Sequence, residues 1–259
     1  MYDRETVKKI CENIELRCKG KSGVVGISGP QGSGKSTIAI DIQSSFSEVG
    51  ISCVILSLDD FYYSRKDRII LAKEIHPLLS TRGVPGTHEA DWLYRVISQI
   101  LLNEDRVKWP IFSKAADDRM HEMHEFVPNH HGPTVILLEG WCVGCLPTTI
   151  EPPMNLLESE EDPTGTWRKY VNNQIRNNYM RIWNLIDVFI YIQVPGWDYV
   201  RIWRGVQAQS NHETHLDLDR FLQFFERISR EMMHESGRIM THIVIKMCSD
   251  HSIEKLHLQ

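Results

Sequence analysis

The sequence has no apolar run long enough to cross a membrane. Its longest runs, at 134–138 and 188–192, are about five residues, whereas a bilayer span needs about 18. It also has no block of Lys or Arg, and 29 basic against 34 acidic residues give a formal net charge of −5. Neither a membrane nor a nucleic acid is therefore expected as a main partner.

Cysteine is sparse, with six residues in a chain of 259. Residues 1–5 lack the charged-then-apolar pattern of a secretory signal, and their acids argue against a transit peptide. The cysteines are therefore expected to be reduced thiols in a cytoplasmic protein, not a disulfide framework. The sequence also lacks internal repeats and low-complexity tracts, so a packed globular chain is expected.

Short β-branched or apolar runs alternate with helical patterns along the chain. Strands are predicted at 24–27, 51–58, 134–138, 188–194 and 241–247, and helices at 3–18, 35–49, 87–103, 167–185, 197–210 and 218–234. The strands lack polar alternation, which is typical of a parallel sheet covered on both faces. The sequence therefore predicts an α/β fold with a mostly parallel five-stranded sheet flanked by helices. Residues 109–133 are expected to be irregular, and 147–166 to form a solvated acidic loop.

A phosphate-binding motif follows the first predicted strand. Gly29–Ser36 reads G-x-x-x-x-G-K-[ST], between a strand and a helix as this motif requires. Glycines let consecutive backbone N–H groups turn toward phosphate oxygens, and the helix N-terminus adds its positive end. Lys35 can reach the β- and γ-phosphates, and Ser36 can bind Mg²⁺. The predicted nucleotide-binding residues are Gly29, Gln31, Gly32, Ser33, Gly34, Lys35, Ser36 and Thr37.

Carboxylates follow two of the other predicted strands. Asp59 and Asp60 end the second, and Glu139 ends the third. The carboxyl ends of parallel strands meet at one edge of the sheet, so these acids are expected to converge on the phosphate loop. Ser36 and Glu139 would then hold Mg²⁺ directly or through water, and Asp59 would lie beside the γ-phosphate. The structural alternatives are a helix N-cap at Asp59 and a turn at Glu139.

The phosphate loop alone does not distinguish a kinase from a GTPase switch or a motor. The Asp-x-x-Gly at 162–165 lies in the acidic loop, residues 184–187 lack the lysine of a guanine-reading motif, and a single acid ends the third strand. A small-molecule kinase instead needs cations that hold an anionic acceptor. Four candidates lie between the second and third strands, each of which could also be an ordinary surface charge: Arg82, His88, Lys114 and Arg119.

Several segments, in order along the chain, resemble a known family. They are Gly29–Ser36, Leu58–Tyr62, Arg82–Glu89, Lys114–Arg119, Leu138–Trp141 and Tyr199–Arg204. Together they resemble D-glycerate 3-kinase and its kinase-like relatives, which belong to the phosphoribulokinase, uridine kinase and pantothenate kinase superfamily. The likeness runs from about residue 22 to the C-terminus, and Arg82–His88 is its most specific part.

The resemblance implies a P-loop NTPase fold with a short helical lid, and ATP with Mg²⁺ as the phosphoryl donor. It places Asp59 as the base on the acceptor hydroxyl and Arg204 as the lid arginine over the transferring group, with Lys35 as the third catalytic residue. The acceptor would be a small, anionic molecule such as D-glycerate, and its predicted ligands are Asp60, Tyr62, Arg82, His88, Lys114 and Arg119. A nucleoside or pantothenate kinase, or an ATP-binding regulatory switch, remains the alternative.

A single domain over 1–259 is expected. It would comprise an N-terminal helix at 1–20, an acceptor-binding excursion at about 61–133 and the lid at about 196–212. The sequence does not indicate an oligomeric state.

Overall fold

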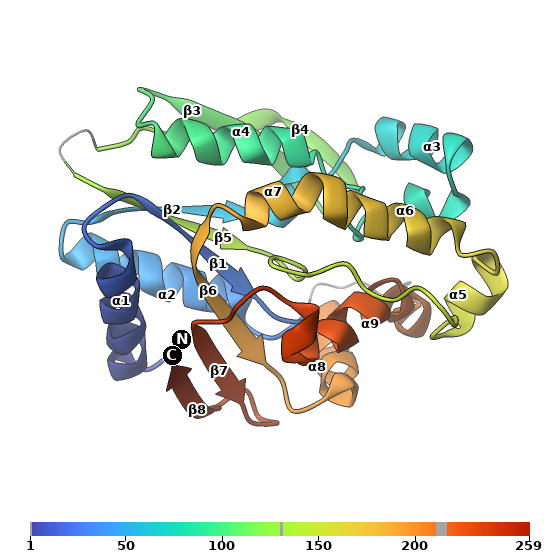
Figure 1. Ribbon diagram of the computed structural model, residues 1–259. Helices are drawn as coiled ribbons and strands as arrows, with labels where there is room; N and C mark the ends of the chain where they lie inside the picture. Colours follow the sequence, from blue (N-terminus) through green and yellow to red (C-terminus); the bar gives the residue numbers. More distant parts are fainter. Residues whose placement is uncertain (1, 130–131, 211–216) are drawn as a thin grey trace.

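The computed structural model describes residues 2–129, 132–210 and 217–259, and the side chains of all of these except 207–210. It contains a six-stranded sheet in the order β2-β5-β1-β6-β7-β8 (Figure 1). The bounds are β1 Gly23–Ser28, β2 Ser52–Ser57, β5 Thr134–Glu139, β6 Ile186–Gln193, β7 Ile243–Met247 and β8 Ile253–Leu258. The first five strands in this order pair in parallel, and β8 pairs antiparallel to β7.

The prediction of five strands is therefore wrong by one. Five strands match the predicted segments, and the sixth, β8, is a partly exposed edge strand that carries Glu254, Lys255 and His257. A polar edge strand of this kind has no continuous apolar run by which periodicity could identify it.

Helices and short turns connect the strands. The helices are α1 (Arg4–Cys18), α2 (Lys35–Glu48), α3 (Arg65–Glu74), α4 (Ala90–Leu101), α5 (Leu156–Glu161), α6 (Thr166–Gln174), α7 (Met180–Trp183), α8 (Trp197–Ser210) and α9 (Leu218–Met233). The turns are η1 (Leu58–Phe61), η2 (Pro77–Ser80), η3 (Ile175–Tyr179, π-helical) and η4 (Glu235–Gly237). Within the described residues, no helix is sufficiently long and apolar to span a bilayer.

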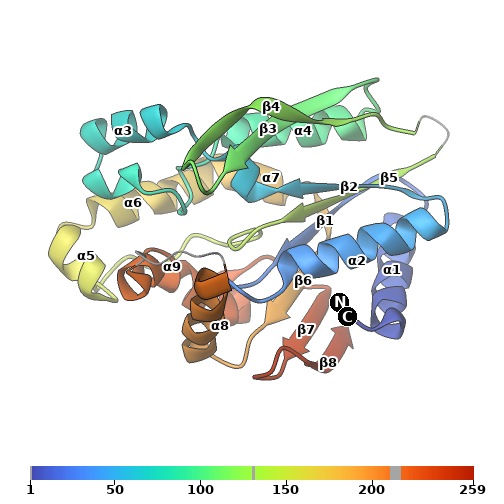
Figure 2. The ribbon, with the colours of Figure 1, turned by 180° about the vertical axis from the view of Figure 1, so that it is seen from behind.

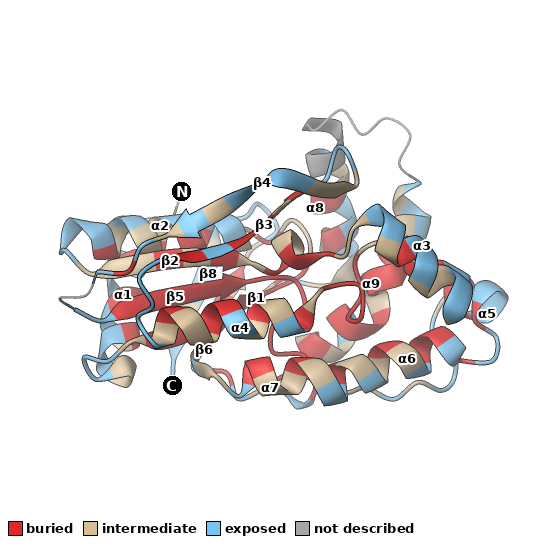
Figure 3. Ribbon diagram, turned by 90° about the horizontal axis from the view of Figure 1, so that it is seen from above, coloured by how far each residue is buried: buried red, intermediate tan, exposed pale blue. Residues whose placement is uncertain are grey.

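Helices cover both faces of the sheet. Helices α1 and α2 lie on one face, and α4, α6 and α7 lie on the other (Figures 1 and 2). Neighbouring residues of β1 point to opposite layers, because side chains alternate along a strand: Val25 packs with α1 and α2, and Val24 packs with α4. Strands β1 and β5 are buried along their whole length, as Figure 3 shows. The prediction of a sheet covered on both faces is confirmed.

A two-stranded antiparallel hairpin, β3 (Val107–Ser113) and β4 (Asp118–Phe126), lies beyond α4. The expectation of irregular structure at 109–133 is wrong here. Pro110 stands inside β3, next to a shift in register, and most of β4 is exposed and rich in His and Glu. Proline and a polar run both argue against a strand when a sequence is read alone, whereas the buried side chains of Trp109 and Phe112 hold β3 in place.

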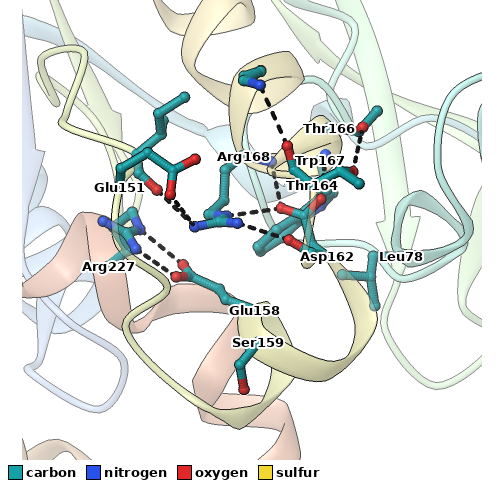
Figure 4. Close-up of polar contacts among 12 residues, drawn as sticks. Leu78, Glu151, Glu158, Ser159, Asp162, Thr164, Thr166, Trp167, Arg168 and Arg227 are labelled. Carbon is teal, nitrogen blue, oxygen red and sulfur yellow. Dashed lines mark hydrogen bonds and ion pairs between the residues drawn. The ribbon is translucent and has the colours of Figure 1, made fainter.

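The prediction of a solvated acidic loop at 147–166 is also wrong. It contains α5, and two of its acids, Glu158 and Asp162, are 1% and 0% exposed. Figure 4 shows the two buried arginines that they bind: Arg168 Nε donates to Asp162 Oδ2 at 2.9 Å, and Arg227 Nε donates to Glu158 Oε1 at 2.8 Å. These pairs fasten the segment to α6 and α9.

Removing one partner of the buried pair is expected to destabilise the fold. Glu158→Ala leaves the Arg227 guanidinium buried without its carboxylate, which typically costs about 3–5 kcal/mol. A matched control is Glu161→Ala on the same helix, because Glu161 forms an exposed pair with Arg220 of α9, and exposed pairs contribute at most about 1 kcal/mol. Urea unfolding of both variants measures the difference. Equal midpoints for the two would show that the buried pair does not stabilise the segment.

Candidate active site

The phosphate loop connects β1 to α2 and requires glycine at two positions. Gly32 and Gly34 have φ of 76° and 91°, in the left-handed region that favours glycine. Gly34 is the residue before α2, and a Cβ added at Gly32 would lie 3.0 Å from Trp203 Cβ of α8. The loop therefore lies against α8, and the N-terminus of α2 opens toward the space between them.

Lys35 begins α2 and turns back over the loop. Its Nζ donates to the Pro30 carbonyl at 2.8 Å. Burial lowers the pKa of Lys35, and the nearby carboxylates of Glu139 and Asp59 oppose that shift. The ammonium group therefore lies near Glu139 and Asp59, two of the acids that were predicted to converge on the phosphate loop.

Glu139 and Asp59 come from adjacent strands, because β5 lies between β1 and β2. Glu139, the last residue of β5, accepts a hydrogen bond from Ser57 Oγ at 2.8 Å. Burial raises the pKa of Glu139, and Lys35 opposes the shift. Asp59 lies in η1, the turn that follows β2 directly. The sheet topology thus places both carboxylates at the edge where the phosphate loop begins.

Asp59 is the most strongly engaged carboxylate at this edge. Lys114 Nζ lies 2.6 Å from Asp59 Oδ2. Burial alone would raise the pKa of Asp59, but Lys114 above all, with His88 and Lys35, brings it below its usual value. Asp59 is therefore a charged hydrogen-bond acceptor at neutral pH.

These groups line one cavity of about 480 Å³. It brings together most of the predicted site residues: Gln31, Gly32, Gly34, Lys35, Ser36, Thr37, Asp59, Tyr62, Arg82, Lys114, Glu139 and Arg204. Both polar atoms of the Gln31 side-chain amide are buried without a hydrogen-bond partner among the described residues. The cavity thus contains groups suited to bind a polar ligand.

The remaining predicted residues do not line this cavity. Gly29 and Ser33 lie within the loop, where a Cβ added at Gly29 would meet Ser33 Oγ at 2.7 Å. Asp60 accepts from the Phe112 N–H at 3.3 Å, toward the hairpin. His88 is 2% exposed, and its Nδ1 lies 2.8 Å from the Tyr179 hydroxyl.

Arg119, the last of these residues, supports the cavity wall from behind. Its Nε donates to the Tyr62 carbonyl at 2.8 Å, and its Nη1 lies 2.9 Å from Glu89. Its guanidinium also lies over the Trp92 ring. The structure therefore shows Arg119 bound to η1 and to the start of α4, not exposed to the cavity.

Arg204 and Arg201 of α8 differ sharply in their surroundings. Arg204 is 8% exposed, lines the cavity and lies with its guanidinium 5.0 Å from the centre of the Phe221 ring. Arg201 is exposed, and its guanidinium pairs with Asp219 at 2.7 Å. Helix α8 covers most of the predicted lid at 196–212, although residues 211–212 lie outside the described residues.

The apolar wall of the cavity and one histidine were not predicted. The wall includes Trp141, Trp203, Phe221 and Phe225, aromatic residues of the kind that sequence reasoning assigns to packing. His251, in the turn between β7 and β8, lies 3.1 Å from the Gly32 carbonyl through Nε2, and its ring is 3.9 Å from that of Trp203. His251 belongs to no motif, and sequence reasoning therefore could not identify it.

Comparisons with known proteins identify kinases among the relatives of this chain. A scan against protein-family models found no match. The chain is 32% identical over 219 residues to an uncharacterized kinase, mug58, of Schizosaccharomyces pombe, covering 79% of this chain and 77% of the relative. It is 27% identical over 194 residues to the chloroplastic D-glycerate 3-kinase of Arabidopsis thaliana, covering 72% of this chain and 41% of that protein.

A solved structure shows the same fold. D-glycerate 3-kinase from Cryptococcus neoformans superposes with a TM-score of 0.75 and 20% identity, covering 98% of this chain and 99% of that one. At this identity the likeness concerns the fold, whereas the Schizosaccharomyces pombe kinase is a relative over most of its length. The chain therefore belongs to the D-glycerate 3-kinase-like family of P-loop kinases.

Proposed function

We propose that the protein transfers the γ-phosphoryl group of ATP to a hydroxyl of a small anionic acceptor such as D-glycerate. The observation that carries this proposal is the shared cavity. Lys35 and the phosphate loop line it together with Asp59 and three cations, Arg82, Lys114 and Arg204. Such a set suits a reaction in which charge on a phosphoryl group is stabilised while an acceptor hydroxyl is aligned.

A second cavity supports ATP as the donor. It has a volume of about 360 Å³ and includes Ser33 of the phosphate loop, Tyr2 and the turn at 251–253. It shares Gly34, Thr37 and His251 with the first cavity. Tyr2 Oη and Ser33 Oγ are buried without a hydrogen-bond partner among the described residues. A triphosphate in the loop would thus have room for its nucleoside on one side and for an acceptor on the other.

The residues present fit a magnesium ion held largely by nucleotide and water. Ser36 and Glu139 both line the first cavity and supply a hydroxyl and a carboxylate. The described residues contain no cluster of three acid, His or Cys side chains placed for a metal. Mg²⁺ with ATP needs only one or two protein ligands, because phosphate oxygens and waters complete its shell. When bound, it would neutralise charge on the β- and γ-phosphates.

Each protein group would then have a distinct task. Lys35 and the loop N–H groups would bind phosphate oxygens, and Arg204 would stabilise charge on the transferring group. Asp59 would accept a hydrogen bond from the acceptor hydroxyl and orient or deprotonate it. Because its own pKa is lowered, Asp59 is ionised at neutral pH and can accept the hydrogen bond that orients the acceptor hydroxyl.

The cations favour an acceptor that carries negative charge. Arg82 and Lys114 both line the cavity, on the side of η1 and the hairpin. Each has a carboxylate partner: Arg82 pairs with Asp117 in the hairpin turn, and Lys114 with Asp59. An acceptor carboxylate could take the place of either partner, and a neutral nucleoside could not. This difference supports a hydroxy-acid over a nucleoside.

The test is ADP production from Mg·ATP with a panel of acceptors. We expect a small hydroxy-acid such as D-glycerate to accelerate ADP release, with one phosphorylated acceptor formed per ADP. Nucleosides, which carry no carboxylate, should not accelerate it, and pantothenate should accelerate it less than D-glycerate does. Acceleration only by one of those compounds would identify a kinase for another acceptor. Tight ATP binding without acceleration by any member of the panel would favour a regulatory switch and contradict the proposal.

A further inference from the structure

A fully buried arginine lies behind the hairpin side of the cavity. Arg68 of α3 is 0% exposed, and among the described residues its ion pair is with the side chain of Asp117, where Nη2 lies 2.9 Å from Oδ2. Its guanidinium also donates to three backbone carbonyls, those of Tyr63, Ser80 and Asp117. A guanidinium stays charged when buried, so the carboxylate of Asp117 balances the charge of Arg68.

Asp117 divides its carboxylate between two arginines. It directly precedes β4, in the turn of the hairpin. Its Oδ2 faces Arg68, and its Oδ1 accepts from Nη1 of Arg82, the arginine that lines the cavity. Both guanidiniums lie beside the same ring, with Arg68 5.9 Å and Arg82 5.7 Å from the centre of Phe112. A buried arginine and a cavity-lining arginine therefore share one carboxylate.

The charges of this group do not cancel. Two guanidiniums and one carboxylate leave one positive charge. Asp118, the next residue, also attracts Arg68. Its carboxylate, however, accepts from backbone N–H groups and forms no ion pair with either arginine among the described residues. Because Arg68 is inaccessible, the unbalanced charge is presented to the cavity through Arg82.

The other cation on the hairpin side is balanced. Lys114 pairs with one carboxylate, that of Asp59, at 2.6 Å, so this pair has no net charge. It also contains the carboxylate that would meet the acceptor hydroxyl. The group around Arg82 is thus the net positive one of the two, which makes it the better place for a negatively charged group of a ligand.

We propose that Arg68 is a positioning residue that engages Asp117, so that Asp117 does not neutralise Arg82 and Arg82 retains positive charge for the anionic group of the acceptor. The identity of that group rests on the proposed function, whereas the sharing of Asp117 does not. The acceptor is thereby oriented, with its anionic group at Arg82 and its hydroxyl at Asp59. Neither Arg68 nor Asp117 lines the cavity, so both act through Arg82.

The first test is Arg68→Met, which removes the buried charge and keeps a long side chain. Asp117 then pairs with Arg82 alone. The KM for D-glycerate should rise about tenfold, with kcat and the KM for ATP within about twofold, because charge is lost near the acceptor and not near the phosphates. The matched control is Lys66→Met, which removes an exposed charge from the same helix and should change the acceptor KM less than about twofold. An unchanged acceptor KM in Arg68→Met would overturn the proposal.

Removing the carboxylate as well separates charge from simple support of the hairpin. The φ of Asp117 is 52°, a left-handed conformation that asparagine also adopts, so Asp117→Asn suits the turn. In the double variant of Arg68→Met with Asp117→Asn, Arg82 regains its charge, and the acceptor KM should return to within about threefold of wild type. A KM that stays raised or rises further is the result of a purely structural Arg68 and would overturn the proposal. If urea unfolding shows that Arg68→Met does not fold, Asp117→Asn alone decides: its acceptor KM should fall, and a KM that does not fall would overturn the proposal.

The sharing of Asp117 is tested without a substrate. A crystal structure of the wild-type protein should show one oxygen of Asp117 on each arginine, and a structure of Arg68→Met should show both oxygens on Arg82. A wild-type Asp117 that binds Arg82 through both oxygens would overturn the proposal. If the wild-type protein phosphorylates no acceptor of the panel, the proposed function fails, while these two structures still decide whether Arg68 divides the carboxylate.

Discussion

Replacing Asp59 by asparagine is expected to lower kcat about 10²–10⁴-fold, the usual contribution of a general base. The substitution keeps the size of the side chain and removes its charge and its ability to take a proton. The affinity for ATP should stay nearly unchanged, because Asp59 faces the acceptor and the loop binds the phosphates. Steady-state kinetics with a saturating acceptor, together with ATP titration of the same variant, measure both quantities.

The ion pair of Asp59 with Lys114 requires a control. Asp59→Asn also removes the partner of Lys114, whose Nζ lies 2.6 Å from the carboxylate. Lys114→Met removes the ion pair and leaves the carboxylate in place. If the base is the important group, this variant should mainly raise the acceptor KM. An unchanged kcat in Asp59→Asn would remove Asp59 from the mechanism.

Replacing Arg204 by alanine is expected to lower kcat about 10³-fold, with a smaller change in the KM for ATP. Arginines that stabilise a transferring phosphoryl group contribute about 10³–10⁵-fold to kcat in related chemistry, and the lower end suits a cation at the cavity wall. Arg204 is buried at that wall, over the Phe221 ring. Comparing kcat with both KM values separates transition-state stabilisation from ATP binding.

Arg201→Ala is the matched control, since Arg201 lies on the same helix and pairs with Asp219 on the exposed side of α8. It should leave kcat unchanged. An effect of Arg204→Ala confined to the KM for ATP would reduce Arg204 to a binding residue. Equal losses in both variants would indicate disruption of α8 and not a role for one guanidinium.

Much of the fold could be predicted because apolar periodicity and a local motif report on it directly. The central strands β1 and β5 are short apolar runs buried on both faces, and the phosphate loop is defined by its own sequence, from Gly29 to Ser36. The missed elements lack such an apolar pattern. The strands β4 and β8 are exposed and polar, and the buried acids Glu158 and Asp162 stand in a run that resembles a solvated loop. Glu158 is buried against Arg227, 69 residues away, which no local pattern reveals, and Asp162 is buried against Arg168, six residues along the chain.

Sequence reasoning could predict the site residues that follow strand ends. It could not predict the residues that hold those side chains in place. Asp59 and Glu139 lie where parallel strands end, so topology alone placed them together. Arg119 was predicted to contact the acceptor, but the structure uses its guanidinium to bind backbone carbonyls of η1. Tyr179 gave no signal at all, because its hydrogen bond to His88 joins residues 91 positions apart.

The most direct measurement is a structure of the protein with Mg²⁺ and a non-hydrolysable ATP analogue. The account predicts that the triphosphate lies in the loop at 29–36, with its γ-phosphate between Lys35 and Arg204. The γ-phosphorus should lie within about 7 Å of the Asp59 carboxylate, the separation that leaves room for one acceptor oxygen. A γ-phosphate outside the loop, or an Asp59 carboxylate well beyond that distance, would contradict it.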